Sequence, residues 1–120
     1  MAKILVVEDS TSMRGLITVT LEQAGYQVLQ AADGEAGYAL AQRQAADLVI
    51  TDVNMPRMDG MTLLKQLRRL PAYRHTPILV LTTEMSEEKR QIARQSGASG
   101  WLVKPFKPQA LLSVLQRFVG

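Results

Sequence analysis

The chain has 120 residues, of which 47% are hydrophobic, and its 14 basic and 11 acidic residues give a formal net charge of +3. This length predicts one compact domain and leaves no room for a second. Because cysteine is absent and His75 is the single histidine, disulfides, thiolate metal sites and a histidine cluster for zinc are excluded.

Short apolar runs alternate with longer stretches of helical periodicity, five times along the chain. This alternation is typical of βαβ units, whose right-handed crossovers produce a parallel sheet. The predicted strands are Lys3–Val7, Gln27–Ala31, Leu48–Thr51, Ile78–Leu81 and Gly100–Val103. Four of them are apolar enough to be buried on both faces, whereas Gln27–Ala31 mixes polar and apolar residues and is predicted at an edge.

The segments between the strands carry helix start and stop signals. N-caps are predicted at Ser10, Asp33, Asp59 and Ser86, glycine stops at Gly25 and Gly97, and a first-turn proline at Pro108. Helical spacing predicts inward faces made by Met13, Leu16, Ile17, Thr20, Leu21 and Ala24, by Leu63, Leu64, Leu67 and Leu70, and by Leu111, Leu112, Leu115 and Phe118.

The apolar runs are only about four or five residues long, whereas a membrane span needs about 20. The start of the chain leads directly into a strand pattern and does not resemble a signal peptide. The basic residues are scattered, and only 5% of residues are aromatic. We therefore expect a soluble, cytoplasmic protein with no membrane insertion and no direct nucleic-acid partner.

Polar side chains stand at the carboxyl ends of four predicted strands. Glu8 and Asp9 follow the first strand, Asp52 follows the third, Thr82 the fourth and Lys104 the fifth. Open α/β sheets place their ligands at this edge. Three acids, a hydroxyl and an amine are therefore predicted to converge there.

Four segments around these residues resemble the receiver domains of two-component response regulators, most closely the stand-alone chemotaxis type, the CheY family. They read Val6-Val-Glu-Asp-Ser, Thr51-Asp-Val-Asn-Met-Pro-Arg-Met-Asp-Gly, Leu79-Val-Leu-Thr-Thr-Glu and Gly97-Ala-Ser-Gly-Trp-Leu-Val-Lys-Pro-Phe. The resemblance covers the whole chain. It implies a doubly wound α/β fold of the flavodoxin-like (βα)5 type, with five parallel strands in the order 2-1-3-4-5. It also implies a single receiver domain over residues 1–120 without an output domain.

The resemblance assigns a phosphoryl acceptor and a metal site. Asp52 is implied to take a phosphoryl group from a histidine kinase as an acyl phosphate. The implied cofactor is Mg2+, with Mn2+ as a substitute, because a hard cation prefers oxygen ligands. Its ligands would be Asp9, Asp52 and the main-chain carbonyl of Asn54, while Glu8 would act through a bound water.

Further residues are implied to sense the phosphoryl group. Lys104 would pair with one phosphoryl oxygen, and the bond between Lys104 and Pro105 is implied to be cis. The Thr82 hydroxyl would donate to another oxygen and move inward, coupled to rotation of Trp101. Tyrosine or phenylalanine is commoner at the last position, so the larger indole is expected to change the balance of inward and outward rotamers. The alternative for Trp101 is a static core residue.

Three residues are implied to set the lifetime of the acyl phosphate. Asn54 and Glu84 form a pair that chemotaxis-type members place beside the phosphoryl group, which argues for a short-lived signal. Thr83 stands where the family usually has a smaller residue. Its β-branched side chain is expected to narrow access and slow attack by water and small donors.

The implied function is that of a response regulator that phosphorylates and dephosphorylates itself on Asp52 and turns over no outside metabolite. Its implied phosphodonor is a chemotaxis-type histidine kinase. Its downstream partner, for which the flagellar motor switch is one candidate, would bind a face made of Glu84–Gln95, Trp101 and Lys107–Phe118. We expect a monomer.

Other functions share parts of this pattern. A phosphate sink and a phosphorelay shuttle would use the same catalytic residues. An FMN-binding, flavodoxin-like electron carrier would share the fold, but Glu8 and Asp9 would repel its phosphate and no aromatic pair is placed to hold a flavin. A phosphotransferase of the haloacid-dehalogenase type needs an acid two residues after its nucleophile, where this chain has Asn54.

Overall fold

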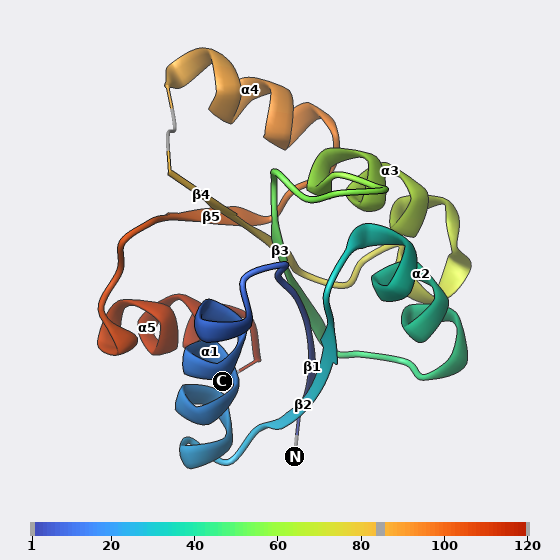
Figure 1. Ribbon diagram of the computed structural model, residues 1–120. Coiled ribbons are helices and arrows are strands. Elements are labelled where there is room, and N and C mark those ends of the chain that lie inside the picture. The colour runs from blue at the N-terminus through green and yellow to red at the C-terminus, as the bar shows by residue number, and fades with distance from the viewer. Residues whose placement is uncertain (1, 84–85, 120) are drawn as a thin grey trace.

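The computed structural model describes residues 2–83 and 86–119, which form five successive βα units (Figure 1). The strands are β1 (Lys3–Val7), β2 (Gln27–Ala31), β3 (Leu48–Asp52), β4 (Ile78–Thr82) and β5 (Gly100–Val103). The helices are α1 (Thr11–Gln23), α2 (Gly34–Arg43), α3 (Gly60–Arg69), α4 (Glu87–Gln95) and α5 (Pro108–Val119), with a short 3-10 helix, η1 (Pro71–Tyr73), after α3.

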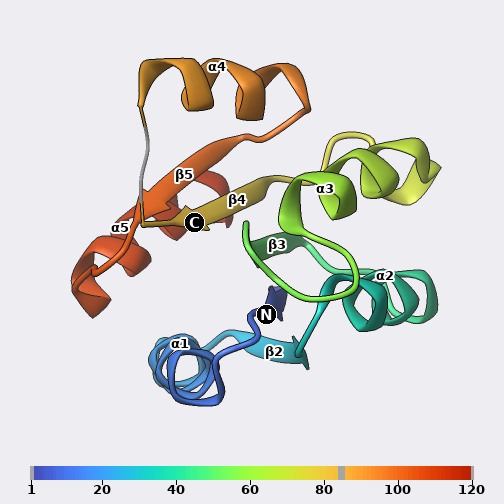
Figure 2. The same ribbon diagram turned by 45° about the horizontal axis from the view of Figure 1, so that its top comes forward.

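All strand pairs are parallel, and the strand order is β2-β1-β3-β4-β5. The predicted fold class and strand order are therefore confirmed. Two strands run one residue further than predicted, so that Asp52 and Thr82 are their last residues. Helices α1 and α5 cover one face of the sheet, and α2, α3 and α4 cover the other (Figure 2).

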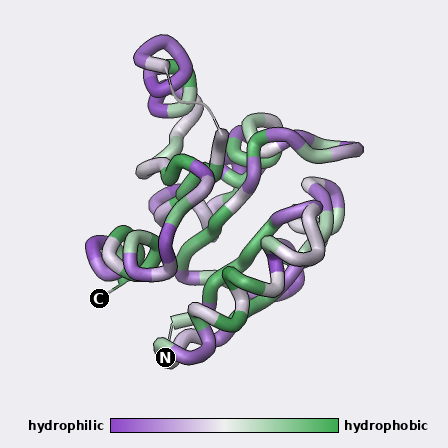
Figure 3. Tube along the Cα trace, turned by 60° about the vertical axis from the view of Figure 1, so that its left-hand side comes forward, coloured by the Kyte–Doolittle hydropathy of each residue, from purple (hydrophilic) through white to green (hydrophobic). Residues whose placement is uncertain are grey.

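Each face of the sheet contributes to its own hydrophobic core. One core joins Leu5, Val7 and Val49 to α3 leucines, and the other joins Ile4, Val6 and Ile50 to residues of α1 and α5. Alternate residues of the central strands point to opposite faces, which places them in opposite cores. Figure 3 shows this arrangement as hydrophobic strand segments inside, whereas α4 is largely hydrophilic.

The fifth strand departs from its predicted burial. We expected Gly100–Val103 to be buried on both faces, but its first three residues are only half-buried and Val103 is 42% exposed. The prediction was wrong because β5 pairs only with β4 and forms the second edge of the sheet. An apolar run alone does not distinguish a central strand from an edge strand.

The helix caps are confirmed for the four predicted residues. The side chains of Ser10, Asp33, Asp59 and Ser86 each accept a hydrogen bond from a main-chain N–H in the first turn of the following helix. Gly25 and Gly97 follow the last turns of α1 and α4 with φ of +96° and +108°, a conformation that favours glycine. Pro108 is the first residue of α5.

The predicted inward faces are only partly correct. Leu16 is 46% exposed and Phe118 is 38% exposed, and Ala24 is also exposed. In α1 the buried stripe instead includes Thr18 beside Ile17, Thr20 and Leu21. The difference arises because α1 contacts the sheet along a narrower stripe than its apolar pattern suggests.

Arg68 connects three segments at the amino-terminal end of β4. Its Nη1 donates to the main-chain oxygens of Tyr73 (2.7 Å) and Thr76 (2.6 Å), and its Nη2 donates to that of Gly97 (2.7 Å). Burial lowers the pKa of this guanidinium. These bonds fix the turn after α4 against the turn before β4.

We expect Arg68→Lys to lower the free energy of unfolding by about 1–2 kcal/mol, because a lysine cannot reproduce this fork of donors to several carbonyls. Urea denaturation measures the change. Arg69→Lys, one residue away on the exposed side of α3, is the matched control and should have almost no effect. Equal effects of the two substitutions would contradict a role for the bonds of Arg68.

Within residues 2–83 and 86–119, none of the helices is both long enough and apolar enough to cross a membrane.

Candidate functional site

Three carboxylates meet at the carboxyl edge of the sheet. Asp52 ends β3, and Glu8 and Asp9 directly follow β1. One oxygen from each of the three side chains lies within 4.8 Å of the others. Strand β1 stands between β2 and β3, so the chain leaves it beside the point where the sheet changes its direction of winding. Ligand sites of open α/β sheets lie at such points.

Lys104 places an ammonium group between two of these acids. Its Nζ lies 2.7 Å from Oε1 of Glu8 and 3.2 Å from Oδ2 of Asp52. Burial by itself lowers the pKa of Lys104, but its hydrogen bonds and ion pairs with Glu8 and Asp52 outweigh burial and raise the pKa above its usual value. Lys104 therefore carries a positive charge at neutral pH and offsets part of the repulsion among the carboxylates.

Glu8 is completely buried, and each of its two carboxylate oxygens has a polar partner. Its Oε2 accepts a hydrogen bond from the main-chain N–H of Ser10 (3.0 Å), and its Oε1 contacts Lys104. Its main-chain oxygen accepts a bond from Nη1 of Arg14 (2.6 Å). A buried carboxylate with these partners has a fixed orientation at the base of the site.

Hydrogen bonds with neighbouring residues fix the position of Asp52 at the start of the loop after β3. Its Oδ1 accepts a hydrogen bond from the main-chain N–H of Val53 (2.9 Å), and its main-chain oxygen accepts one from the Thr51 hydroxyl (2.9 Å). The N–H of Gly60 donates to the main-chain oxygen of Val53 (2.8 Å), which closes the loop between β3 and α3. A Cβ on Gly60 would overlap the main-chain oxygen of Asp52.

A pocket of about 240 Å³ lies between the loop after β3, strand β4, α3 and α4. We call it the Thr82 pocket, and it is lined by Val53, Asn54, Met61, Val80, Thr82, Thr83, Lys89, Ile92 and Ala93. Three residues for which the resemblance implied roles, Asn54, Thr82 and Thr83, therefore line one cavity. Glu84, the fourth residue expected near it, lies outside the described residues.

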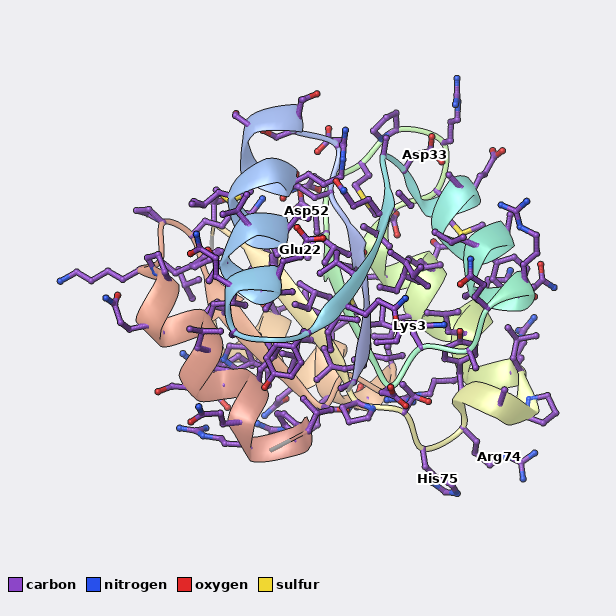
Figure 4. All side chains as sticks on the ribbon, turned by 90° about the horizontal axis from the view of Figure 1, so that it is seen from below. Lys3, Glu22, Asp33, Asp52, Arg74 and His75 are labelled. Atoms are coloured by element: carbon purple, nitrogen blue, oxygen red, sulfur yellow. The ribbon has the colours of Figure 1, made fainter. Side chains whose placement is uncertain are left out.

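The structure also places the other residues that the sequence singled out. The Lys104–Pro105 peptide bond is cis, as the resemblance implied. Trp101, the predicted switch residue, is half-buried on β5 and is not among the described residues that line the Thr82 pocket. His75 lies at the opposite end of the molecule from Asp33 and Asp52, so it has no part in the site (Figure 4).

The donor set suits a hard divalent cation. Clustered carboxylate oxygens are the ligands that Mg2+ prefers, and Mg2+ usually combines one or two carboxylates with several waters. Glu8 is already engaged by Lys104 and Ser10. Asp9, which is exposed, and Asp52 are therefore the side chains best able to bind such an ion directly.

Sequence reasoning missed three residues that support the site. Ser10 is predicted only as a helix cap, Gly60 appears only as the end of a segment that carries the resemblance, and Arg14 has no predicted role. The structure adds the Ser10 N–H and Arg14 as partners of Glu8, and Gly60 as the close neighbour of Asp52. The glycine directly after the predicted cap Asp59 was the one available signal, because close backbone approach often requires glycine.

The chain matches the response regulator receiver domain family over residues 4–116. It is 39% identical to the chemotaxis protein CheY1 of Helicobacter pylori, in an alignment that covers 98% of this chain and 97% of that protein.

Solved structures share the fold at high similarity. The chemotaxis response regulator CheY4 of Vibrio cholerae gives a TM-score of 0.96 at 51% identity, with 99% of both chains covered. The receiver domain of the sensor histidine kinase PA1611 from Pseudomonas aeruginosa, described with a magnesium ion coordinated in its active-site cleft, gives a TM-score of 0.91 at 34% identity. That alignment covers 99% of this chain and 98% of the other.

Proposed function

The chain belongs to the response regulator receiver family, with CheY-type relatives over nearly its whole length, and we propose that it accepts a phosphoryl group on Asp52. In this reaction a carboxylate oxygen of Asp52 attacks the phosphorus of a phosphohistidine. A new P–O bond forms, the P–N bond to the donor breaks, and the electron pair stays with the imidazole.

The contact between Lys104 and Asp52, 3.2 Å long, is the observation that carries the proposal. Phosphoryl transfer needs its negative charge neutralised more than it needs covalent assistance. A lysine charged at neutral pH beside the nucleophile supplies a fixed positive charge for a phosphoryl oxygen. Asp9, Asp52 and the main-chain carbonyl of Asn54 would hold Mg2+, with Mn2+ as a substitute, and Glu8 would act on the ion through water. When bound, the ion would neutralise further phosphoryl charge.

The signal would be a change in the conformation of the receiver domain. Thr82, which ends β4 beside the site, would donate its hydroxyl to the phosphoryl group, and Trp101 would turn inward toward the Thr82 pocket. Asn54, Thr83 and Glu84 would set the lifetime of the acyl phosphate. The β-branched Thr83 beside the pocket supports a slower reaction with small donors than a smaller residue would give.

Residues 1–120 would act as a receiver domain, cytoplasmic and monomeric. Its phosphodonor would be a chemotaxis-type histidine kinase. A downstream protein, such as the flagellar motor switch, would bind the face of α4, β5 and α5. Similarity to chemotaxis proteins over nearly the full chain supports a chemosensory role. We expect no turnover of an outside metabolite.

Trp101 fluorescence tests this proposal, because the chain has only one tryptophan. We expect Mg2+ to quench the emission and beryllofluoride, added next, to change it again. The first response reports the metal site, and the second reports a conformation coupled to an acyl-phosphate mimic.

The Asp52→Ala variant is the control and should lose the second response. If Mg2+ causes no change in the wild-type protein and isothermal calorimetry detects no binding, the metal-dependent site is absent. If calorimetry detects binding of Mg2+ and then beryllofluoride without a change in emission, Trp101 is a static residue and does not take part in the switch. Transfer from phosphorylated Asp52 back to a histidine phosphotransfer domain would instead indicate a phosphorelay shuttle.

A further inference from the structure

Trp101 is held by two arginines of the neighbouring helix. The guanidinium carbons of Arg90 and Arg94 lie 5.2 Å and 5.3 Å from the centre of the indole ring. Both residues belong to α4 and stand four positions apart, so they project from the same side of the helix. Cations at this distance from an indole are attracted by the ring, most strongly when water is partly excluded.

The ring lies at the edge of the sheet and outside the Thr82 pocket. Trp101 is paired with Val80 in the sheet, and Val80 and Thr82 both line that pocket. Paired residues of parallel strands point to the same face, and so do residues two positions apart. The pocket and the indole therefore share one face of the sheet, with the pocket one strand nearer the centre.

The Thr82 pocket is large enough to receive an aromatic ring. Its volume is about 240 Å³, whereas cavities of about 150 Å³ already hold benzene. Part of its lining is apolar, with Met61, Val80 and Ile92 among the residues that would contact a ring. In the structure the indole instead lines a second pocket, which includes Val114 and Phe118 of α5.

The contacts of Arg90 and Arg94 with the indole differ in their desolvation cost. Nε of Arg90 is buried without a hydrogen-bond partner among the described residues. Such a nitrogen loses hydration, which offsets part of the attraction between Arg90 and the ring. Arg94 is exposed, so its side chain keeps most of its hydration. The Arg90 contact is thus less hydrated but carries a desolvation cost, whereas the Arg94 contact is better hydrated, so each contact is tested by its own substitution.

We infer that Arg90 and Arg94 are positioning residues that hold Trp101 out of the Thr82 pocket and so set the fraction of molecules in the signalling conformation. This inference rests on the proposed function, in which the inward position of Trp101 accompanies phosphorylation. Residues of α4 thereby set the sensitivity of a switch whose chemistry takes place at Asp52. Inward rotation of the indole must break both ring contacts, so loss of either arginine raises the inward population.

The test compares Arg94→Gln and Arg90→Gln with the wild-type protein at saturating Mg2+. We expect each substitution to lower the beryllofluoride concentration that gives the half-maximal fluorescence change by roughly two- to fivefold. Arg43→Gln, which removes the same charge from an exposed position in the last turn of α2, should leave this concentration unchanged.

Acrylamide quenching of Trp101 fluorescence in the resting protein, without metal or beryllofluoride, shows whether the arginines restrain the indole or only cover its ring. An indole that has turned into the pocket is less accessible, so quenching should fall in Arg94→Gln. Greater quenching with an unchanged half-maximal concentration would mean that the arginines only cover the ring, and would overturn the inference. A wild-type protein that does not bind beryllofluoride would overturn the proposed function, while the quenching experiment would still decide whether the arginines restrain Trp101.

Discussion

Asp52→Asn is expected to reduce phosphorylation by acetyl phosphate by at least about a thousandfold, to below detection in an intact-mass measurement. The substitution keeps the shape of the side chain and an oxygen that can still accept the bond from the N–H of Val53. It removes the charged nucleophile that attacks phosphorus, and it removes a carboxylate oxygen from the Lys104 ion pair. The expected loss is therefore chemical and does not require unfolding.

Asp59→Asn is the matched control for this experiment. Asp59 lies in the same loop and caps α3, a position that asparagine occupies equally well. Its exposed carboxylate is not part of the cluster of Glu8, Asp9 and Asp52. The Asp59→Asn variant should be phosphorylated at the wild-type rate. Undiminished phosphorylation of the Asp52→Asn variant would mean that another acid, such as Asp9 of the same cluster, is the acceptor.

Gly60→Ala is expected to lower the free energy of unfolding by about 3 kcal/mol or more. A Cβ at this position would overlap the main-chain oxygen of Asp52, and its next neighbours are also main-chain atoms, of Asp52 and Val53. Backbone cannot move aside as the end of a flexible side chain can, so the loop after β3 must shift. The shift would also move Asp52, so the affinity for Mg2+ should fall together with the stability.

Gly15→Ala is the comparison, and it should change the free energy of unfolding in the opposite direction. Gly15 lies in the exposed part of α1, and a Cβ there would meet no atom within 4 Å. Alanine in a helix interior should raise stability by about 0.5–1 kcal/mol. Urea denaturation of both variants checks the pair. If Gly60→Ala were also stabilising, the close approach between Gly60 and Asp52 would not exist in solution.

The acids of the site could be predicted because each one follows a strand that its own sequence specifies. The apolar run before Glu8 and Asp9, and the run that ends at Asp52, predict two strands whose carboxyl ends meet at one edge. The supporting contacts could not be predicted in this way. Arg14 reaches the main-chain oxygen of Glu8 through a geometry that appears only once α1 is folded.

Burial at the edges of the sheet was the weakest part of the prediction. Gly100–Val103 has the composition of a buried strand, and Phe118 stands at core spacing in α5, but β5 has a neighbour on one side only. This edge position leaves Trp101 half-exposed and within reach of Arg90 and Arg94. No local pattern connects an indole on a strand to two arginines on the preceding helix.

The strands, the helix caps and the chemical groups at the carboxyl edge follow from local sequence, because hydrophobic periodicity and capping act over a few neighbouring residues. Which of these groups touch depends on how the elements pack together. Lys104 meets Glu8 across 96 positions of the chain, and Arg68 meets Gly97 across 29. Such pairs form when β1, β3, β4 and β5 become neighbours, and the free energy of that arrangement comes from burying both cores rather than from the residues that meet.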